Sequence, residues 1–249
     1  MTIYAIGDIH GQIGMLDGVL ERIAADGADD GPGGADEVIF TGDLVDRGPH
    51  AKQVIDRLIA GKAEGRRWTT IRGNHDTMFM RFLANARLDD PAIKSGAPWT
   101  HVNLGGTATL ASYGIDTGPD RSVEDLFAQA QDLVPQAHRD FLDAMPLWAE
   151  RDEVLFIHAG IRPGIPLEAQ EEQDIIWIRD EFYAESGPHP WLIVHGHTIV
   201  PEVTHFGNRI DIDTGAGASG TPRFLSVVAF EGTDCFVLTE AGRVPLRPE

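Results

Sequence analysis

The sequence predicts an α/β fold, because short apolar segments alternate with helical patterns along the chain. Five segments of three or four residues are apolar and end in glycine or a polar cluster, as buried strands do. They lie at residues 3–6, 38–40, 68–71, 154–157 and 192–194. Between the first three lie two amphipathic helical patterns, with apolar faces formed by Met15, Leu16, Val19, Leu20 and Ile23, and by Val54, Ile55, Leu58 and Ile59. Such alternation of strands and helices implies an α/β sheet.

Each of the five expected strands is followed by Asp, Asn or His. The polar clusters begin at residues 7, 41, 72, 158 and 195. In open α/β sheets, ligands bind beyond the carboxyl ends of the strands. We therefore expect these side chains to form one site.

Two parts of the chain depart from the alternation. Residues 88–150 look mostly helical, so we expect an insertion that covers one side of the site within a single domain of residues 1–249. Strand-like segments at residues 209–212, 224–230 and 235–238 follow one another without intervening helices. They predict antiparallel pairs.

Composition and charge limit the classes of function. The 20 basic and 39 acidic residues give a net charge of −19, which argues against a nucleic-acid or anionic-membrane binder. An anionic substrate remains compatible, because bound metal ions can reverse the local field. The single cysteine, Cys235, excludes an intrachain disulfide and a cysteine-based zinc site. The chain has no long apolar run, and its first residues do not resemble a signal peptide, so we expect a cytoplasmic protein that binds no membrane.

The polar strand ends supply carboxylate, imidazole and amide groups without a thiolate. The candidate ligands are Asp8, His10, Asp43, Asn74, His158 and His197. This donor set suits Mn²⁺, Fe²⁺, Zn²⁺ or Co²⁺, and six ligands suit two ions that share a bridging carboxylate, about 3.5–4 Å apart. Singly, each Asp could be a helix cap and each His a packed residue. Five such ends in succession are much harder to explain in that way.

Several motifs together resemble the calcineurin-like metallophosphoesterases, and most of all their phosphoprotein phosphatase branch. These are Gly-Asp-Ile-His-Gly at residues 7–11, Gly-Asp-Leu-Val-Asp-Arg-Gly at 42–48, Gly-Asn-His-Asp at 73–76, His-Ala-Gly at 158–160 and His-Gly-His-Thr at 195–198. Trp99, Gly105, Gly106 and Thr109 also resemble residues of bacterial members. The resemblance implies a two-sheet β-sandwich flanked by helices, with a mostly helical insertion.

The resemblance also implies residue roles. Asp8, His10 and Asp43 would hold one divalent ion, and Asp43 would bridge to a second ion held also by Asn74, His158 and His197. A hydroxide shared by the ions would attack phosphorus, and Mn²⁺ is the expected metal, with Fe, Zn, Co or Ni as alternatives. His75 would be the general acid, oriented by Asp46. Arg47 and Arg179 would bind phosphate oxygens. His195 stands where eukaryotic members carry another arginine that contacts phosphate.

The motifs leave the substrate open between two branches of the family. The Asp-Arg-Gly sequence at residues 46–48 resembles the second motif of protein phosphatases. Asp76, at the end of the third motif, resembles the residue found in symmetrical dinucleoside tetraphosphatases. Asp46 carries the greater weight, because it supports protonated His75. We therefore expect a serine/threonine phosphoprotein phosphatase, acting on a phosphorylated protein or a small phosphoester, with symmetrical bis(5'-nucleosyl)-tetraphosphatase as the alternative. A catalytically inactive module that binds phosphate or a partner would be expected to lack a ligand, His75 or Arg47, and none is missing.

Overall fold

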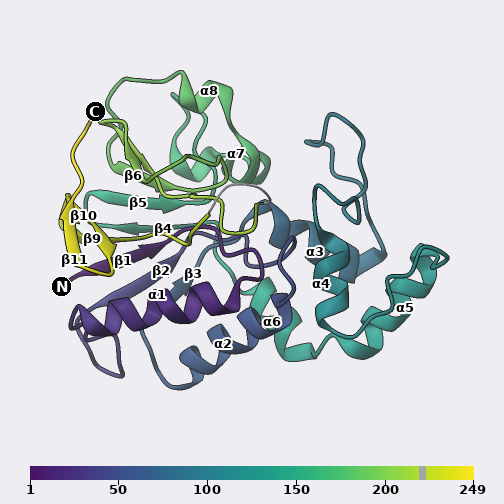
Figure 1. Cartoon of the computed structure of the whole chain (residues 1–249). Helices are drawn as coiled ribbons and strands as arrows, with labels where there is room; N and C mark the ends of the chain where they lie inside the picture. Colours follow the sequence, from purple (N-terminus) through teal and green to yellow (C-terminus); the bar gives the residue numbers. More distant parts are fainter. Residues whose placement is uncertain (219–222) are drawn as a thin grey trace.

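Two mixed β-sheets form the centre of the molecule (Figure 1). The structure is a computed structural model that describes residues 1–218 and 223–249. The first sheet has the order β11-β10-β9-β1-β2-β3. Its strands β1, β2 and β3 are parallel, while β9, β10 and β11 continue the sheet in antiparallel pairs. The strand bounds are β1 Ile3–Ile6, β2 Glu37–Phe40, β3 Trp68–Thr70, β9 Val227–Glu231, β10 Asp234–Thr239 and β11 Gly242–Pro245.

The second sheet has the order β4-β5-β6-β8-β7. Its strands are β4 Trp148–Arg151, β5 Val154–Ile157, β6 Leu192–His195, β7 Thr204–His205 and β8 Arg209–Asp211. The central strands β5, β6 and β8 run parallel, and β4 and β7 pair antiparallel at the two edges. Each sheet thus contains parallel strands whose carboxyl ends can carry a site.

The alternation of side chains along the strands builds three apolar layers. On β1, Ile3 and Ala5 face the layer between the sheets, whereas Tyr4 and Ile6 face the layer under α1 and α2. The same period of two on β5 directs Phe156 between the sheets and Leu155 toward α7 and α8. Burial of both faces of both sheets explains why these strands are continuous apolar runs.

Helices cover the outer face of each sheet. Helices α1 and α2 pack on the first sheet, and α7 and α8 pack on the second. Helices α3, α4 and α5 lie together at the side of the molecule away from β9, β10 and β11 (Figure 1). The helix bounds are α1 Ile13–Ala25, α2 Ala51–Ala63, α3 Asn74–Asn85, α4 Gly106–Ser112, α5 Val123–Leu133, α6 Gln136–Asp143, α7 Glu172–Trp177 and α8 Asp180–Tyr183, with a short 3₁₀ helix at Leu167–Ala169.

The expected α/β sandwich is confirmed, with two corrections of detail. Residues 88–150 contain α4, α5 and α6. The range ends inside β4, a strand that pairs antiparallel with β5. The segment expected at residues 209–212 pairs antiparallel with β7 and also parallel with β6. Within the described residues, no helix is both long and apolar enough to cross a membrane.

Candidate metal centre and active site

The loops after five parallel strands converge between the two sheets. The first sheet contributes Asp8 and His10 after β1, Asp43 after β2 and Asn74 after β3, and the second contributes His158 after β5 and His197 after β6. All six side chains are at most 7% exposed. The expected ligands are therefore brought together in one buried cluster.

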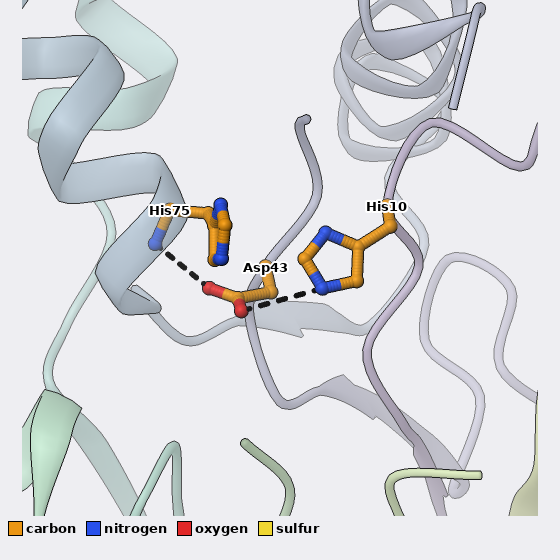
Figure 2. Close-up of side chains that lie close together, drawn as sticks. All are labelled: His10, Asp43 and His75. Carbon is orange, nitrogen blue, oxygen red and sulfur yellow. Dashed lines mark hydrogen bonds and ion pairs between the residues drawn. The ribbon is translucent and has the colours of Figure 1, made fainter. Parts of the chain in front are cut away.

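Asp43 lies at the centre of this cluster, between His10 and His75 (Figure 2). Its Oδ2 atom is 3.6 Å from Nε2 of His10, and its Oδ1 atom is 3.5 Å from Nε2 of His158. Oδ1 also accepts a hydrogen bond from the backbone N–H of His75 at 2.9 Å. The two carboxylate oxygens thus face imidazoles from different sheets, which is the geometry of a bridging ligand.

Asn74 joins the two histidines of the second sheet. Its Oδ1 atom is 2.9 Å from Nε2 of His158 and 2.9 Å from Nδ1 of His197. His158 Nδ1 lies 2.8 Å from the carbonyl of Thr41, and in the tautomer that donates this bond Nε2 carries only a lone pair. Two acceptors would then face each other across 2.9 Å, an arrangement that a shared cation stabilises.

Several ligand atoms at the centre lack a protein partner. Within the described residues, Asp8 Oδ1, His10 Nε2 and His197 Nε2 are buried without a hydrogen bond. Nδ1 of His10 bonds the carbonyl of Val45 at 2.8 Å, which orients the ring so that Nε2 faces Asp43. Buried polar atoms usually have partners, so this set of orphaned nitrogen and oxygen atoms fits divalent metal ions.

Metal-ligand distances alone select two overlapping groups. One consists of Asp43, His158 and His197, and the other of His10, Asp43 and His75. Both nitrogens of His75 already have side-chain partners, whereas Asp8 offers a free oxygen. Asp8 also accepts a bond from the backbone N–H of His197 at 3.1 Å.

Burial sets the charge states of the ligands. It lowers the pKa values of His10 and His197, so both imidazoles are neutral, as metal binding requires. Burial, followed by repulsion from Asp213 and Asp43, raises the pKa of Asp8. A divalent cation would relieve that repulsion.

His75 and Asp46 form a hydrogen-bonded dyad beside this cluster. Nδ1 of His75 is 2.6 Å from Oδ2 of Asp46, and Nε2 is 3.2 Å from the guanidinium of Arg47. Because Arg47 can only donate, Nε2 accepts and Nδ1–H donates to Asp46. The His75 ring meets His10 edge to face at 4.8 Å between centroids, so the dyad adjoins the metal cluster.

Strained backbone is concentrated in the site. Seven residues other than glycine have positive φ among those that the structure describes, and five belong to the site: His10, Asp43, Asp46, Arg47 and His197. Such conformations persist where surrounding contacts enforce them, and they cluster at functional positions.

The expected phosphate-binding residues are placed differently from one another. Arg47 contacts His75, and exposed Arg179 lies beside the site, 3.5 Å from the carbonyl of His197. His195 is fully buried and packs edge-on against Phe182 and Tyr183. Burial lowers its pKa to about 3. The structure does not bring this side chain to the open side of the site, so its position does not support the expected contact with substrate.

Asp76 has a structural role that its sequence position did not indicate. Its carboxylate accepts backbone N–H groups of Asp43, Leu44 and Gly73, each at 2.9 Å. It therefore connects the loop of the bridging ligand to the start of α3. Its place three residues after Gly73, in the first turn of a helix, was the available signal.

An open cleft of about 700 Å³ lies beside Trp177 and Arg179. Arg179 and Trp177 line it on one side, and Lys94 from the segment before α4 lines it as well. The Trp177 ring also meets the His197 ring at 5.6 Å between centroids, so one residue contacts both the cleft and the ligand cluster.

The fold and the buried cluster of Asp, Asn and His side chains agree with a phosphoesterase that uses divalent metals. The family model for calcineurin-like phosphoesterase matches residues 1–218, and the chain belongs to this family.

Curated relatives from different bacteria share one name. The asymmetrical bis(5'-nucleosyl)-tetraphosphatase PrpE of Bacillus thuringiensis is 28% identical over 236 residues, covering 86% of both chains. The PrpE of Halalkalibacterium halodurans is 26% identical over 241 residues, covering 88% of this chain and 87% of its own.

Solved structures share the fold at low sequence identity. A candidate diadenosine tetraphosphatase has a TM-score of 0.64 at 19% identity, covering 100% of this chain and 95% of its own. A cold-active protein-tyrosine phosphatase of a Shewanella species has a TM-score of 0.62 at 16% identity, covering 99% of this chain and 80% of its own.

Proposed function

We propose that this chain is a two-metal hydrolase of phosphomonoesters, with phosphoserine and phosphothreonine proteins as its main substrates. The observation that carries the proposal is the His75–Asp46 dyad, held at 2.6 Å beside the bridging carboxylate of Asp43. A dyad of this kind is most useful where the leaving group is a poor one.

The ligand cluster provides two overlapping binding sites for metal. Asp8, His10 and Asp43 would hold one ion, and Asp43, Asn74, His158 and His197 the other. We expect Mn²⁺, with Fe, Zn, Co or Ni as alternatives, because carboxylate, amide and imidazole ligands suit these ions. When bound, two such ions supply Lewis acidity, which acidifies a water and withdraws charge from phosphoryl oxygens.

The remaining residues position the substrate and move a proton. Arg47 would bind the phosphoryl oxygens through its guanidinium, which also adjoins His75 Nε2. Arg179 would bind from the side of the open cleft. Once the guanidinium of Arg47 leaves Nε2 for the phosphoryl oxygens, His75 would take up a proton at Nε2 and deliver it to the leaving oxygen, while Asp46 fixes the ring through Nδ1 and stabilises its positive charge. Proton transfer of this kind contributes about 10²–10⁴-fold.

The chemistry of the leaving group supports this substrate class. A serine or threonine alkoxide is a poor leaving group, so its departure depends on protonation by His75. The net charge of −19 opposes long-range attraction of a highly charged tetraphosphate, although salt screens this effect beyond about 8 Å.

A second candidate activity is dinucleoside tetraphosphate hydrolysis, which the names of the PrpE relatives favour. The cleft offers the cations Lys94 and Arg179 and the ring of Trp177 for a phosphate chain and a base, but Asp174, Asp180 and Glu181 also line it and oppose an anionic ligand. Cleavage at the centre of diadenosine tetraphosphate would give two molecules of ADP, and off-centre cleavage would give AMP and ATP.

A comparison of kcat/KM tests the ranking of the two activities. A phosphothreonine peptide and diadenosine tetraphosphate are assayed with the same Mn²⁺-loaded protein at the same salt concentration. We expect the peptide to be preferred, and a clear preference for the dinucleotide would reverse the ranking. Absence of any hydrolysis, including that of p-nitrophenyl phosphate, would instead favour an inactive binding module.

A further inference from the structure

We infer that Trp99 and Thr109, from the segment that follows α3, are positioning residues that orient the Asp46–His75 dyad. The inference rests on the proposed role of His75 as the proton donor, and it adds that the segment after α3 completes the dyad.

Both oxygens of the Asp46 carboxylate are held by these two residues. The indole N–H of Trp99 donates to Oδ2 at 2.7 Å, the same oxygen that faces Nδ1 of His75 at 2.6 Å. The hydroxyl of Thr109 donates to Oδ1 at 2.6 Å. The carboxylate therefore has a donor on each oxygen besides the imidazole, which leaves it one orientation.

Thr109 also holds the backbone of Asp46. Its Oγ1 atom accepts the Asp46 N–H at 2.7 Å, so one hydroxyl bonds both the main chain and the side chain of the same residue. Asp46 has φ of 71°, a left-handed conformation that a non-glycine residue adopts only under constraint. Thr109, the fourth residue of α4, supplies part of that constraint.

Trp99 connects the dyad to the helix that carries His75. Its ring is fully buried and packs against Phe79 and Phe82 of α3, at 5.6 and 5.1 Å between centroids. Gly106 permits this packing, because a Cβ there would lie 2.5 Å from the indole ring. Since Trp99 contacts α3 through its ring and Asp46 through its N–H, it sets the distance between the two members of the dyad.

Burial alone would not require this arrangement. A buried indole N–H needs one acceptor and a buried hydroxyl needs one partner, and in most proteins a backbone carbonyl is that partner. Here both donors are directed at the single carboxylate that orients His75. Loss of either donor should therefore affect the proton transfer more than the metal cluster, whose ligands neither residue contacts by a hydrogen bond in the described structure.

The test compares substrates with poor and good leaving groups. Trp99→Phe removes the N–H and keeps an aromatic ring in the stack, while Thr109→Val removes the hydroxyl at constant shape and Thr109→Ser retains it. We expect Trp99→Phe and Thr109→Val to lower kcat for a phosphothreonine peptide by about 10-fold, a part of the general-acid contribution. The loss for p-nitrophenyl phosphate should be under about 3-fold. Mn²⁺ affinity should not change, and Thr109→Ser should keep most of the wild-type rate.

A double variant separates positioning from general destabilisation. If Trp99 acts through His75, adding Trp99→Phe to His75→Asn should cause no further loss of kcat, because residues of one unit are not additive. Equal losses for both substrates, or a full additional loss in the double variant, would overturn the inference.

The proposed function can fail separately from this inference. If His75→Asn itself shows no dependence on the leaving group, the proton-donor role is wrong, whatever Trp99 does. If the side-chain variants do not fold, the indole N–H resonance of Trp99 decides the question in the folded His75→Asn protein. A shift of that resonance relative to wild type supports the shared carboxylate, and an unchanged resonance refutes it.

Discussion

Gly196 faces the free oxygen of Asp8, and this contact makes a sharp test of the metal centre. A Cβ at position 196 would lie 2.1 Å from Oδ1 of Asp8, whereas real Cβ contacts essentially never fall below 3.0 Å. The carboxylate or the loop after β6 must therefore move by about 1 Å in Gly196→Ala, at a cost of roughly 1–3 kcal/mol for overpacking. A misplacement of that size at a reacting centre costs about 10²-fold in rate. We expect weaker binding of one Mn²⁺ ion and a rate about 100-fold lower.

The assay combines equilibrium dialysis of Mn²⁺, kcat with p-nitrophenyl phosphate and thermal melting with and without chelator. Gly14→Ala is the control, because a methyl in that turn of α1 would meet no atom of the described residues within 4 Å. The double variant Asp8→Ala/Gly196→Ala removes the clash, so in chelator it should melt above Gly196→Ala while still lacking the metal. A folded Gly196→Ala protein with two ions bound at wild-type affinity and wild-type activity would refute the assignment of Asp8 as a ligand.

Three further substitutions test the bridging role of Asp43, the general-acid role of His75 and the effect of buried His138 on stability. Asp43→Asn should weaken the binding of both ions and nearly abolish activity. We expect saturating Mn²⁺ to raise the melting temperature of wild type but not that of the variant; two ions bound at wild-type affinity would contradict this. His75→Asn should keep both ions and slow the hydrolysis of alkyl phosphates by about 10²-fold or more, with a smaller loss of rate for aryl phosphates. Dissociation of the metals would argue against the role of His75 as general acid. Burial lowers the pKa of His138, so the unfolded chain takes up the proton first and stability should fall as the pH drops below about 6.5. Melting curves at pH 7.5 and 5.5 should show a smaller drop in His138→Gln, and an equal drop would exclude His138 as the cause.

The ligand cluster could be predicted because its residues follow strands that are apolar on both faces. The runs at residues 38–40 and 154–157 are buried throughout, and Asp43 and His158 occur within three residues of their ends. A strand of this kind fixes the direction in which the chain leaves the sheet, so the positions of the next few residues follow from it.

The parts that escaped prediction depend on contacts between distant segments. His195 and His197 flank the same glycine, Gly196, yet Phe182 and Tyr183 from α8 pack against His195, whereas Trp177 packs against His197. The parallel pairing of β8 with β6 likewise joins separate segments, and a strand of three residues does not specify its partner. No local pattern encodes such contacts.

The loop after β2 explains how the metal centre and the acid keep a common geometry. Within five residues it carries the carboxylate of Asp43, which is the proposed bridging ligand, the carboxylate of Asp46 and the guanidinium of Arg47, and all three residues have positive φ. Each such residue costs of the order of 1–3 kcal/mol, so the loop would relax if its ends were free.

Hydrogen bonds at both ends of the loop prevent that relaxation. At one end, Asp76 holds the backbone of Asp43 and Leu44, and at the other, Thr109 bonds the N–H of Asp46 while the carbonyl of Gly105 accepts the N–H of Arg47 at 3.3 Å. The starts of α3 and α4 thus hold one strained loop from both ends. Any shift of α4 would then act first on Asp46 and Arg47 and only afterwards on Asp43, because the backbone of Asp43 is held by Asp76 of α3. Proton donation and phosphate binding should therefore be more sensitive than metal affinity to changes in the segment after α3.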